Sequence, residues 1–547
     1  MVNEILMDSC FPFKDAAGKP SYRKGQRECI LKILAAQEQG YTLFGIDAPV
    51  GFGKSPVIVA VLQYNAQSGQ SGFYTTPQKI LQNQLLRDFP DVPQIKGRSN
   101  YICLDAPAVS YEEGACQLGG DYQCPYDPKF DEDGVPQNQN FSGTTCTYIE
   151  ARNKCKQAKA CGMNTAYLTL AKFFGNRAIC VFDEAHGIPE QMVDSLGIKL
   201  YHKDIDAAFP RSTAFAAHVD WMRQVVQPQL TQKIADAGKK LLALKKYPER
   251  LKAAIAEKKR LEGTLENLNR LVEDYNKVHE DWVITSDNNR FGSFVYYRPI
   301  TSARFLEGLI WSRGAMVIVA SGTIDMEYYI KEAGLEKRKF DPELCVFTAE
   351  SEFPAEKSPI FYRGLGKLTY KEKDITMPKI MAAINKVIRE RQDVRGMIHT
   401  FSYERAEYIR DHIAPDLKHL LVFQDQKDRV GSLNAWFESK GPSVFVSTNM
   451  TEGVDLKGDL CRYQIYMKIA YANISDKRVA ARTGRNDWLW YSMQAIEDIE
   501  QASGRATRSK EDWSEMFIFD SSFGDLLKRY NKCFKQWFKA RVKQCPL

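Results

Sequence analysis

Short apolar runs recur along the chain and alternate with stretches of helical periodicity. Residues 41–46 form an apolar run, a turn with Gly51 and Gly53 follows, and an apolar helix is expected from about Lys54. Further runs typical of buried strands occupy residues 72–75, 178–182, 315–320, 396–399, 444–447, 463–467 and 516–519. Because buried strands that alternate with helices form parallel sheets covered on both faces, the pattern predicts an α/β fold with two such sheets.

A segment from residue 96 to about residue 150 interrupts this alternation. It is rich in Gly, Asp, Asn, Pro and Cys and has little apolar periodicity. Such a composition buries too little apolar surface to fold by hydrophobic packing alone. We therefore expect an insertion that some other kind of bond holds together.

A second interruption, residues 200–288, has a helical pattern and many charges. Its apolar positions follow a coiled-coil-like spacing at Leu261, Leu265, Leu268, Val272 and Tyr275. Its Lys-rich face is typical of a solvated helix surface, and a nucleic-acid contact is the alternative. The basic and aromatic stretch 526–543 leaves a similar choice between docking on the core and binding nucleic acid.

Length and composition indicate the class of protein. The chain has 547 residues, a hydrophobic content of 44% and a formal charge of +7, so it can form several cores and is compatible with a polyanionic partner. It shows neither a secretory leader pattern nor a run of about 18 apolar residues. We expect a soluble, cytoplasmic or otherwise intracellular protein, with a nuclear or viral setting left open. Its 13 cysteines should then be reduced thiols.

The stretch "APVGFGKS", which starts at Ala48, resembles a phosphate-binding loop between a strand and a helix. Amides around Gly51 and Gly53 can face phosphates, Lys54 can reach the outer phosphates, and the hydroxyl of Ser55 can bind Mg²⁺. Ala48 replaces the first glycine of the usual pattern. The stretch predicts an ATP and Mg²⁺ site, and a plain glycine turn before a helix is the alternative.

An acidic pair follows the predicted strand 178–182. Asp183 would hold the metal through water, and Glu184 would orient the attacking water. His186, two positions later, would face the interface between the two sheets or serve only in packing. Together with the phosphate loop, this pair predicts nucleotide hydrolysis.

A third group of candidate residues lies in "QASGRATRS", far down the chain. Gln501, Arg505 and Arg508 are spaced three or four residues apart on a predicted helix, so they share one face. As arginine fingers, Arg505 and Arg508 would stabilise charge on the departing phosphate, an effect of about 10³ to 10⁵ in rate. A surface salt-bridge pair is the alternative.

These stretches, in this order, resemble the XPD/DinG type of iron-sulfur superfamily 2 DNA helicase. The resemblance covers nearly the whole chain and rests on "YRKGQRE", "APVGFGKS", "YTTPQKILQNQ", "DEAH", "SGTI", "IHTFSYERAEYI", "TEGVDLKGD" and "QASGRATR". It implies two RecA-like domains with ATP between them and single-stranded DNA across both. It also implies that Arg23 and Gln26 read the adenine base.

Further site residues follow from the resemblance by matching position. Four residues would approach the DNA backbone: Thr76, Gln82, Ser402 and Thr451. Three others, Glu452, Gly453 and Asp455, would sense the nucleotide and transmit closure of the domains. Small polar side chains that bind phosphate give a grip independent of base sequence.

The resemblance also gives the cysteine-rich insertion a function. Cys103 follows "GRSNY" and Cys146 precedes the predicted helix with "ARNK", as in the family's cluster domain, so Cys103, Cys116, Cys124 and Cys146 would bind a 4Fe-4S cluster. Structural zinc and free thiols are the alternatives. Cys155 or Cys161 could take the place of Cys146, although both are more typical of packing residues on the following segment.

The resulting domain assignment has six parts. They are 1–95, the start of helicase domain 1; 96–150, the iron-sulfur domain; 151–199, domain 1 with its DEAH box; 200–288, a helical Arch-like domain; 289–345, the end of domain 1; and 346–547, helicase domain 2.

The predicted function is that of a monomeric, ATP-dependent motor. By resemblance it moves 5′ to 3′ on single-stranded or forked DNA and unwinds the duplex, with DNA repair among the open pathways and RNA left open as a substrate. One alternative is a nucleic-acid translocase or remodeller without processive unwinding. Another is a non-catalytic, helicase-like recruitment subunit.

Overall fold

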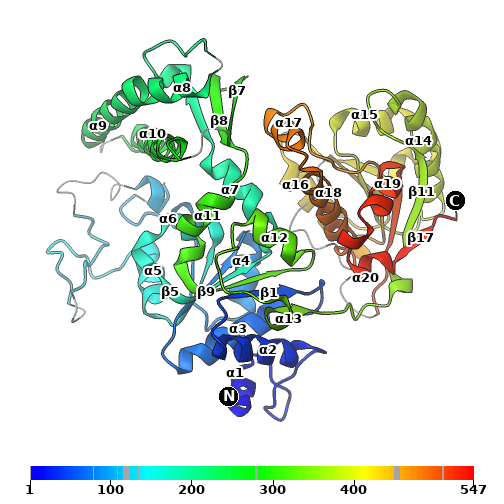
Figure 1. Cartoon of the computed structure of the whole chain (residues 1–547), viewed down its shortest axis with the longest axis horizontal. Helices are drawn as coiled ribbons and strands as arrows, with labels where there is room; N and C mark the ends of the chain where they lie inside the picture. Colours follow the sequence, from blue (N-terminus) through cyan, green and yellow to red (C-terminus); the bar gives the residue numbers. More distant parts are fainter. Residues whose placement is uncertain are drawn as a thin grey trace.

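The computed structural model describes most of the chain. The described residues are 2–77, 79–106, 109–114, 123–131, 133, 135–212, 214–244, 247–277, 281–448, 456, 458–507 and 511–546. Two lobes that each contain a parallel sheet lie side by side, and long helices cross above the first lobe (Figure 1). No helix in these described ranges is long and apolar enough to cross a membrane.

The first lobe contains a seven-stranded parallel sheet. Its strands, in spatial order, are β10 (Val346–Thr348), β1 (Leu43–Asp47), β9 (Gly314–Ser321), β5 (Arg177–Asp183), β2 (Gly72–Thr76), β4 (Ala160–Asn164) and β3 (Gln94–Ile95). All neighbouring pairs are parallel. This arrangement brings the carboxyl ends of β1 and β5, which are separated by more than 100 residues in the sequence, to the same edge.

Both faces of this sheet are buried, which explains the continuous apolar runs in its strands. Along β5, Ile179 and Val181 pack into the core beneath α2 (Gln26–Glu38) and α3 (Lys54–Gln67), with α1 (Glu4–Cys10) packed on α3. Cys180 and Phe182 face the opposite core. That core is covered by α6 (Thr165–Leu170), α7 (Ile188–Leu196), α11 (Ala303–Leu309) and α12 (Met326–Glu332).

The second lobe repeats this architecture. Its strands, in spatial order, are β13 (Leu421–Phe423), β14 (Val444–Ser447), β12 (Gly396–His399), β15 (Tyr463–Tyr466), β16 (Glu515–Asp520), β11 (Ile360–Gly366) and β17 (Val542–Gln544), again all parallel. One face carries α14 (Lys373–Arg389) and α15 (Tyr403–His412). The other carries α18 (Trp488–Ser503), α19 (Ser522–Arg529) and α20 (Gln536–Lys539). The predicted α/β class with two sheets is confirmed.

The basic and aromatic C-terminal stretch docks on this second lobe. Phe534 and Phe538 are buried against Phe523, and β17 extends the sheet beside β11. Its aromatic residues therefore serve the core.

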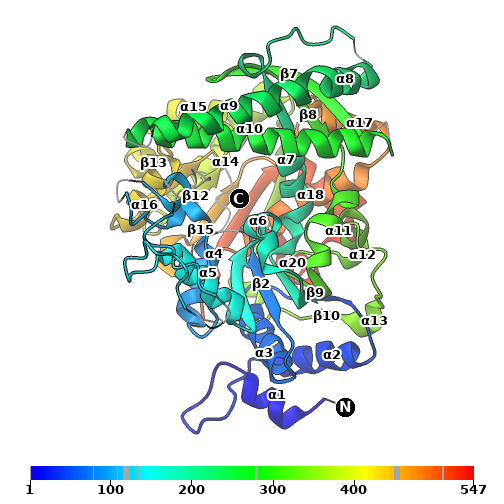
Figure 2. The same ribbon diagram turned by 90° about the vertical axis from the view of Figure 1, so that its left-hand side faces the viewer.

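Long helices and a small antiparallel sheet form a third unit (Figure 2). The helices are α8 (Phe215–Trp221), α9 (Gln227–Leu244) and α10 (Pro248–Tyr275), and the sheet order is β6 (Ile198–Tyr201), β8 (Gly292–Pro299) and β7 (Trp282–Asn289). The spaced apolar positions of α10, among them Leu261 and Leu268, pack into the core of this unit. Periodicity predicted the helices of this unit but not its sheet, because the strands are half-exposed and lack continuous apolar runs.

The insertion after residue 96 has little regular structure, as its composition indicates. Its described parts contain the single turns η1 (Arg98–Asn100) and η2 (Tyr111–Glu113) and isolated bridges, for example between Ile102 and Ser110. Regular structure resumes at α5 (Thr147–Gln157), directly after Cys146.

Candidate nucleotide and nucleic-acid sites

The phosphate loop lies between β1 and α3, as predicted. Gly51 and Gly53 have φ angles of 91° and 80°, a left-handed region in which side chains are strained. The Nζ of Lys54 donates to the carbonyl of Ala48 at 3.2 Å and lies 3.7 Å from Oε1 of Glu184. The lysine charge thus lies between the loop and the acidic pair.

Arg23 and Gln26 lie against this loop. The side-chain amide of Gln26, which is 2% exposed, donates to the carbonyls of Phe52 and Gly53 at 2.9 and 3.0 Å. Arg23 donates to the carbonyl of Gly51 through its guanidinium group. Both residues hold the loop in shape, and their predicted contact with adenine stays a prediction.

Asp183 ends β5, and Glu184 follows it in a left-handed conformation with φ of 50°. Burial and the charge of Glu184 raise the pKa of Asp183 to about 6, and Lys54 partly opposes this rise. Burial alone would also raise the pKa of Glu184, but the charges of Lys54, His186 and Arg505 lower it. The environment therefore keeps Glu184 ionised, in the state needed to orient water.

Tyr74, on β2, joins the two predicted Mg²⁺ ligands. Its hydroxyl donates to Oδ2 of Asp183 at 3.0 Å and is hydrogen-bonded to Ser55. Tyr74 is 1% exposed. Sequence reasoning missed it, since a tyrosine in an apolar strand is typical of packing.

A hydrogen-bonded chain connects the two lobes at His186. One ring nitrogen of His186, Nδ1, lies 3.0 Å from Oγ of Ser321, and the other, Nε2, lies 2.6 Å from the side-chain amide nitrogen of Gln501. Gln501 therefore contacts the first lobe through His186.

Arg505 faces the same cleft from the end of α18. It is 7% exposed, and its charge lowers the pKa of Glu184 on the opposite lobe. Beside it, a Cβ built on Gly504 would lie 3.4 Å from Cγ2 of Val50 in the phosphate loop. The structure thus brings the phosphate loop, the acidic pair and Arg505 together. Arg508, Gly453 and Asp455 lie outside the described residues, as do Thr451 and Glu452.

Lys535 is a contact between the lobes that sequence reasoning missed. Its Nζ donates to Oδ2 of Asp47, at the end of β1, and to the carbonyl of Ile324, both at 2.7 Å. Its backbone amide donates to Oε1 of Glu500 at 2.6 Å. One residue of the second lobe therefore fixes the start of the phosphate loop, the "SGTI" stretch and the helix that carries Gln501. Nothing in a lysine-rich terminal stretch marks this position.

The predicted DNA contacts differ in how accessible they are. Ser402 caps α15, its hydroxyl accepting from the amide of Arg405 at 3.2 Å, at the carboxyl edge of the second sheet. Thr76 ends β2 and is 2% exposed. Gln82 is fully buried, and its amide donates to the carbonyl of Ile95 at 2.7 Å, so it holds β3 in place.

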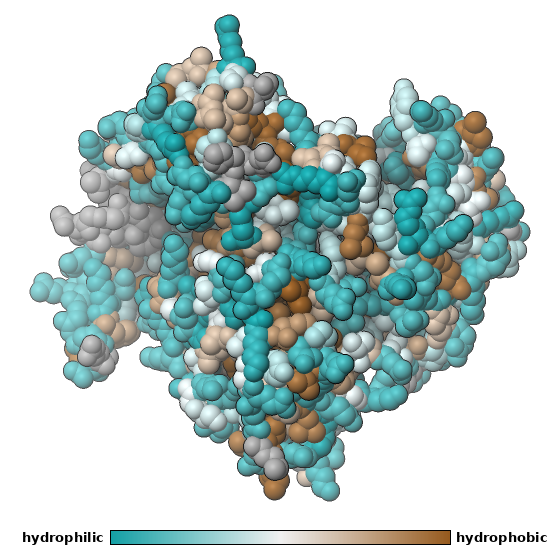
Figure 3. Space-filling model, in the orientation of Figure 1, coloured by the Kyte–Doolittle hydropathy of each residue, from teal (hydrophilic) through white to brown (hydrophobic). Residues whose placement is uncertain are grey.

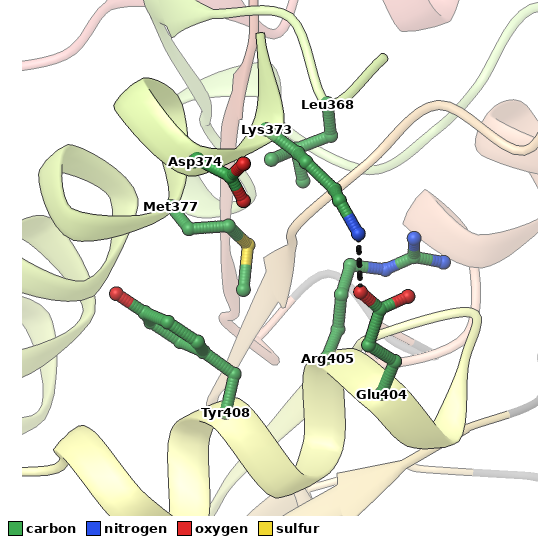
Figure 4. A pocket seen from close by; sticks show the side chains of 7 residues that line it. All are labelled: Leu368, Lys373, Asp374, Met377, Glu404, Arg405 and Tyr408. Atoms are coloured by element: carbon green, nitrogen blue, oxygen red, sulfur yellow. Dashed lines mark hydrogen bonds and ion pairs between the residues drawn. The ribbon is translucent and has the colours of Figure 1, made fainter. Parts of the chain in front are cut away.

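A pocket of about 300 Å³ opens beside Ser402, between α14 and α15 (Figure 4). The Nζ of Lys373 lies 2.6 Å from Oε1 of Glu404 across it. Burial lowers the pKa of Arg405, whose stem forms one wall. The lining residues are Leu368, Lys373, Asp374, Met377, Glu404, Arg405 and Tyr408.

The cysteine-rich insertion brings three of the predicted cluster ligands into one neighbourhood. Cys103 and Cys146 are 4% and 3% exposed, and Cys124 is half-buried. Burial raises the pKa of the Cys124 thiol, and the charges of Asp105, Cys103 and Cys146 add to this effect. The amide of Cys146 donates to the carbonyl of Tyr126 at 2.8 Å, which ties the two ends of the loop together.

Cysteine thiolates are suitable metal ligands, but the described thiols do not converge into a complete metal site. Every cysteine in the described ranges is free of a disulfide, and within those ranges no three Cys, His, Asp or Glu side chains converge closely enough to bind a metal. Cys116 lies outside the described residues. Cys155 and Cys161 are fully buried, and their thiols are hydrogen-bonded to each other within the core of the first lobe.

Two RecA-like sheets that share a phosphate loop, an acidic pair and an opposing arginine define the class of nucleotide-dependent motor proteins. The comparisons narrow this class. The helicase C-terminal domain family matches residues 384–541. The Fanconi anemia group J protein homolog of Gallus gallus is 26% identical over 104 residues, which are 17% of this chain and 8% of that protein. The ATP-dependent DNA helicase DinG of Photobacterium profundum is 22% identical over 273 residues, 46% of this chain and 38% of that protein.

Solved structures agree in fold. An XPD helicase superposes with a TM-score of 0.61 at 16% identity, over 96% of this chain and all of that one. Xpd4 of S. tokodaii gives a TM-score of 0.54 at 12% identity, over 95% of this chain and all of that one. The chain spans less than half of the length of the curated relatives described above. Together with the motifs, these similarities support the predicted resemblance to XPD/DinG-type superfamily 2 helicases.

Proposed function

We propose that the chain is an ATP- and Mg²⁺-dependent helicase that moves 5′ to 3′ on single-stranded DNA and separates duplexes at a fork. The observation that carries this proposal is the cleft in which Lys54 and Glu184 of one lobe face Arg505 of the other. A scaffold protein gains nothing from charges that converge across a movable interface. This arrangement therefore favours the motor over a recruitment subunit.

Each residue of the cleft has a distinct task in this proposal. Lys54 would bind the outer phosphates, and Ser55 and Asp183 would hold Mg²⁺, which when bound would neutralise negative charge on the departing phosphate. Glu184, kept ionised by Lys54, orients the attacking water. Arg505 stabilises the developing charge from the second lobe, together with Arg508. Gln501 contacts His186, and Nδ1 of His186 lies 3.6 Å from Oε2 of Glu184. Movement of the second lobe would therefore be transmitted from Gln501 through His186 to Glu184.

The cysteine-rich insertion would hold a 4Fe-4S cluster through Cys103, Cys116, Cys124 and Cys146. A cluster would cross-link a segment that has little apolar packing of its own. Cys155 and Cys161 already satisfy one another in the core, which favours Cys146 as the ligand on this side.

Contacts between the insertion and the long helix α10 support a closed path for one strand. Lys259 donates to the carbonyl of Glu112 at 2.7 Å, and the Nζ of Lys252 lies 3.3 Å from Oε1 of Glu113. These two partly exposed contacts are individually weak, so they suit a ring that opens to admit DNA.

The decisive experiment measures ATP hydrolysis and strand separation on the same preparation. Lys54→Ala should abolish DNA-stimulated hydrolysis, while Lys239→Ala, at a side chain of α9 that is 79% exposed, serves as a control. Forked and single-tailed duplexes of both polarities then test direction. Hydrolysis that survives Lys54→Ala contradicts the nucleotide site, and hydrolysis without strand separation favours a translocase.

A separate measurement tests the cluster. Anaerobically purified protein should contain iron and absorb visible light, and Cys103→Ser should lose both while Cys533→Ser, a half-buried cysteine of the second lobe, retains them. Wild-type protein without iron would refute the cluster and leave the motor proposal intact.

A further inference from the structure

One face of the antiparallel sheet β6–β8–β7 carries aromatic and basic side chains in alternation. Along β6 and β8, Ile198, Leu200, Val295 and Tyr297 pack inward against the helices. The alternate residues point the other way, and cross-strand pairing sets Lys199 beside Tyr296 and Tyr201 beside Phe294. With Lys203, Arg290 and Phe291 from the adjoining turns, these residues make up what we call the aromatic–basic face.

The rings of this face form a continuous row. The centroid of Tyr201 lies 5.3 Å from that of Phe294 and 6.5 Å from that of Phe291, and Phe294 lies 6.4 Å from Tyr296. Phe294 is 6% exposed, and Tyr201 and Tyr296 are half-buried, whereas Phe291, at the end of the row, is 53% exposed. The ring of Phe291 at the tip of the hairpin is not covered by the rest of the protein. Such an exposed ring is typical of a binding surface.

Three cations stand over these rings. Nζ of Lys199 lies 4.8 Å from the ring centre of Tyr296, Nζ of Lys203 lies 5.9 Å from that of Phe291, and the guanidinium of Arg290 lies 4.7 Å from the same ring. All three side chains are exposed, and none forms an ion pair with a carboxylate within the described part of the chain. Their charge is available to an anion.

Few acids oppose these cations. Asp194 lies near Tyr296, and Asp287 pairs with Phe294 across β7 and β8. Glu257 lies near Lys203 but is bound by Arg260. Arg298, on the same side of β8, is neutralised by Asp476 of the second lobe at 2.6 Å. The aromatic–basic face therefore keeps a net positive charge.

The surface around this face is open. Hydrophobic side chains reach the surface over the β7–β8 hairpin (Figure 3). The second lobe contacts the sheet through α17 (Lys477–Gly484), which packs against β7, and the Nζ of Lys477 donates to the carbonyl of Ile284 at 3.0 Å. The hairpin tip with Arg290 and Phe291 is exposed, so a flexible strand can reach the face there.

From these observations we infer that the aromatic–basic face binds single-stranded nucleic acid, separately from the path across the two RecA-like sheets. A base can stack on the exposed ring of Phe291, and flexible cations meet the neighbouring phosphates. A base that stacks on Phe291 displaces Arg290 or Lys203 from the ring and frees that cation for the neighbouring phosphate. A protein partner of acidic character would pair with the cations but would leave the exposed ring of Phe291 without a function.

This inference rests on the proposed function and extends it, because it gives the proposed helicase a second binding site for single-stranded nucleic acid. All DNA contacts implied by the motifs lie in the two RecA-like lobes, at Thr76, Gln82, Ser402 and Thr451. The aromatic–basic face belongs to the third unit and has no such motif.

The test is the binding of fluorescent single-stranded DNA and RNA at several salt concentrations. Replacing Lys199, Lys203 and Arg290 together by Ala should lower the salt slope of the binding constant by about 2, since each lost phosphate contact on a single strand removes about 0.7. Phe291→Ala should weaken binding roughly 5- to 150-fold, the equivalent of 1–3 kcal/mol for one stacked base, with an unchanged salt slope. Phe291→Tyr should restore affinity.

Matched controls separate this face from net charge. Replacing Lys154, Lys239 and Lys277 by Ala removes the same charge at side chains that are 68%, 79% and 70% exposed. Affinity and slope in the face variants equal to those of this control would overturn the inference. Equal losses for DNA and for polyphosphate, with no effect of Phe291→Ala, would also overturn it, because stacking would then play no part.

The outcome can be told apart from that of the proposed function. DNA-stimulated ATP hydrolysis by the wild type tests the motor on the same preparation. If hydrolysis is stimulated and the face variants bind normally, only the inference fails. If binding depends on the face and no stimulation occurs, the motor proposal fails and the face stands.

Discussion

At the residue scale, the nucleotide site depends on buried groups that no motif marks. Tyr74 is the clearest case, because its hydroxyl reaches both Ser55 and Asp183. A donor that stabilises the charged form of a carboxyl group keeps its pKa down. Tyr74 therefore limits the rise in the pKa of Asp183 that burial produces.

Removing that hydroxyl should shift the acid limb of the reaction. Asp183 must be ionised to bind Mg²⁺, so kcat/KM for ATP falls as the pH drops through about 6. In Tyr74→Phe the limb should move to higher pH by roughly 0.7 units, the equivalent of about 1 kcal/mol for one hydrogen bond. The profile of kcat/KM against pH measures it. Tyr64→Phe, on the far side of α3, is the control, and an unmoved limb in Tyr74→Phe would contradict the assignment.

The buried carboxyl group of Glu500 makes the free energy of unfolding depend on pH. It is 1% exposed, its Oε2 lacks a hydrogen-bond partner within the described ranges, and burial raises its pKa to about 8. A carboxyl group with a raised pKa binds its proton more tightly in the folded state than in the unfolded state. Its contribution to stability is therefore complete below the unfolded pKa and is lost as the pH rises through about 8.

The free energy of unfolding should accordingly fall between pH 5 and pH 8, by at most about 1.4 kcal/mol per pH unit from this group. Glu500→Gln keeps the shape and removes the titration, so the fall should flatten. Denaturant titrations of both proteins at pH 6 and pH 8 compare the slopes. Parallel slopes would show that Glu500 does not titrate in this range.

At the scale of elements, the sequence predicted what local patterns determine. The strand at 396–399 and the phosphate loop were found because apolar runs and glycine turns carry local signals. The sheet β6–β8–β7 was missed, because its strands are half-exposed and one lies some 80 residues from the others in the chain. Lys535 was missed for a related reason, since its role depends on partners hundreds of residues away.

The ion pair of Lys535 and Asp47 joins an element of the second lobe to the end of β1 in the first lobe. Its side chains are only 15% and 13% exposed, so breaking the pair leaves a charge without compensation. Lys535→Met should lower the DNA-stimulated kcat roughly 5-fold or more, while KM for ATP changes little, because Lys54 and Arg23 still hold the nucleotide loop.

A double-mutant cycle with Asp47→Asn isolates this contact. If the pair acts as a unit, the double variant should lose no more activity than Lys535→Met alone. Lys539→Met is the control, because this half-buried lysine at the end of α20 donates to the carbonyl of Asn531 in its own lobe. Additive losses would show that the two residues act independently.

At the scale of the whole molecule, α17 connects the second lobe to the rest of the chain. Arg478 forms two bonds with Glu190 on α7, at 2.7 and 2.9 Å, and Arg482 forms two with Glu332 on α12 at the same distances. The arginines are 6% and 3% exposed. Motif reasoning gave both lobes and their order but not this joint, because arginines on a short helix look like any solvated surface.

Bidentate pairs of this kind fix orientation as well as distance, so they should limit how the lobes move when the cleft closes. Removing one partner of a buried pair costs about 3–5 kcal/mol, and the cost at α17 falls on the interface rather than on either core. In Arg478→Ala/Arg482→Ala, two labels on opposite lobes should therefore show a broader distance distribution by single-molecule fluorescence, and thermal unfolding should separate into two transitions. Arg389→Ala, which breaks an exposed pair with Asp416 inside the second lobe, should leave both readouts unchanged. A single sharp distance in the double variant would mean that His186, Gln501 and Lys535 suffice to hold the lobes, and that α17 serves the fold of its own lobe alone.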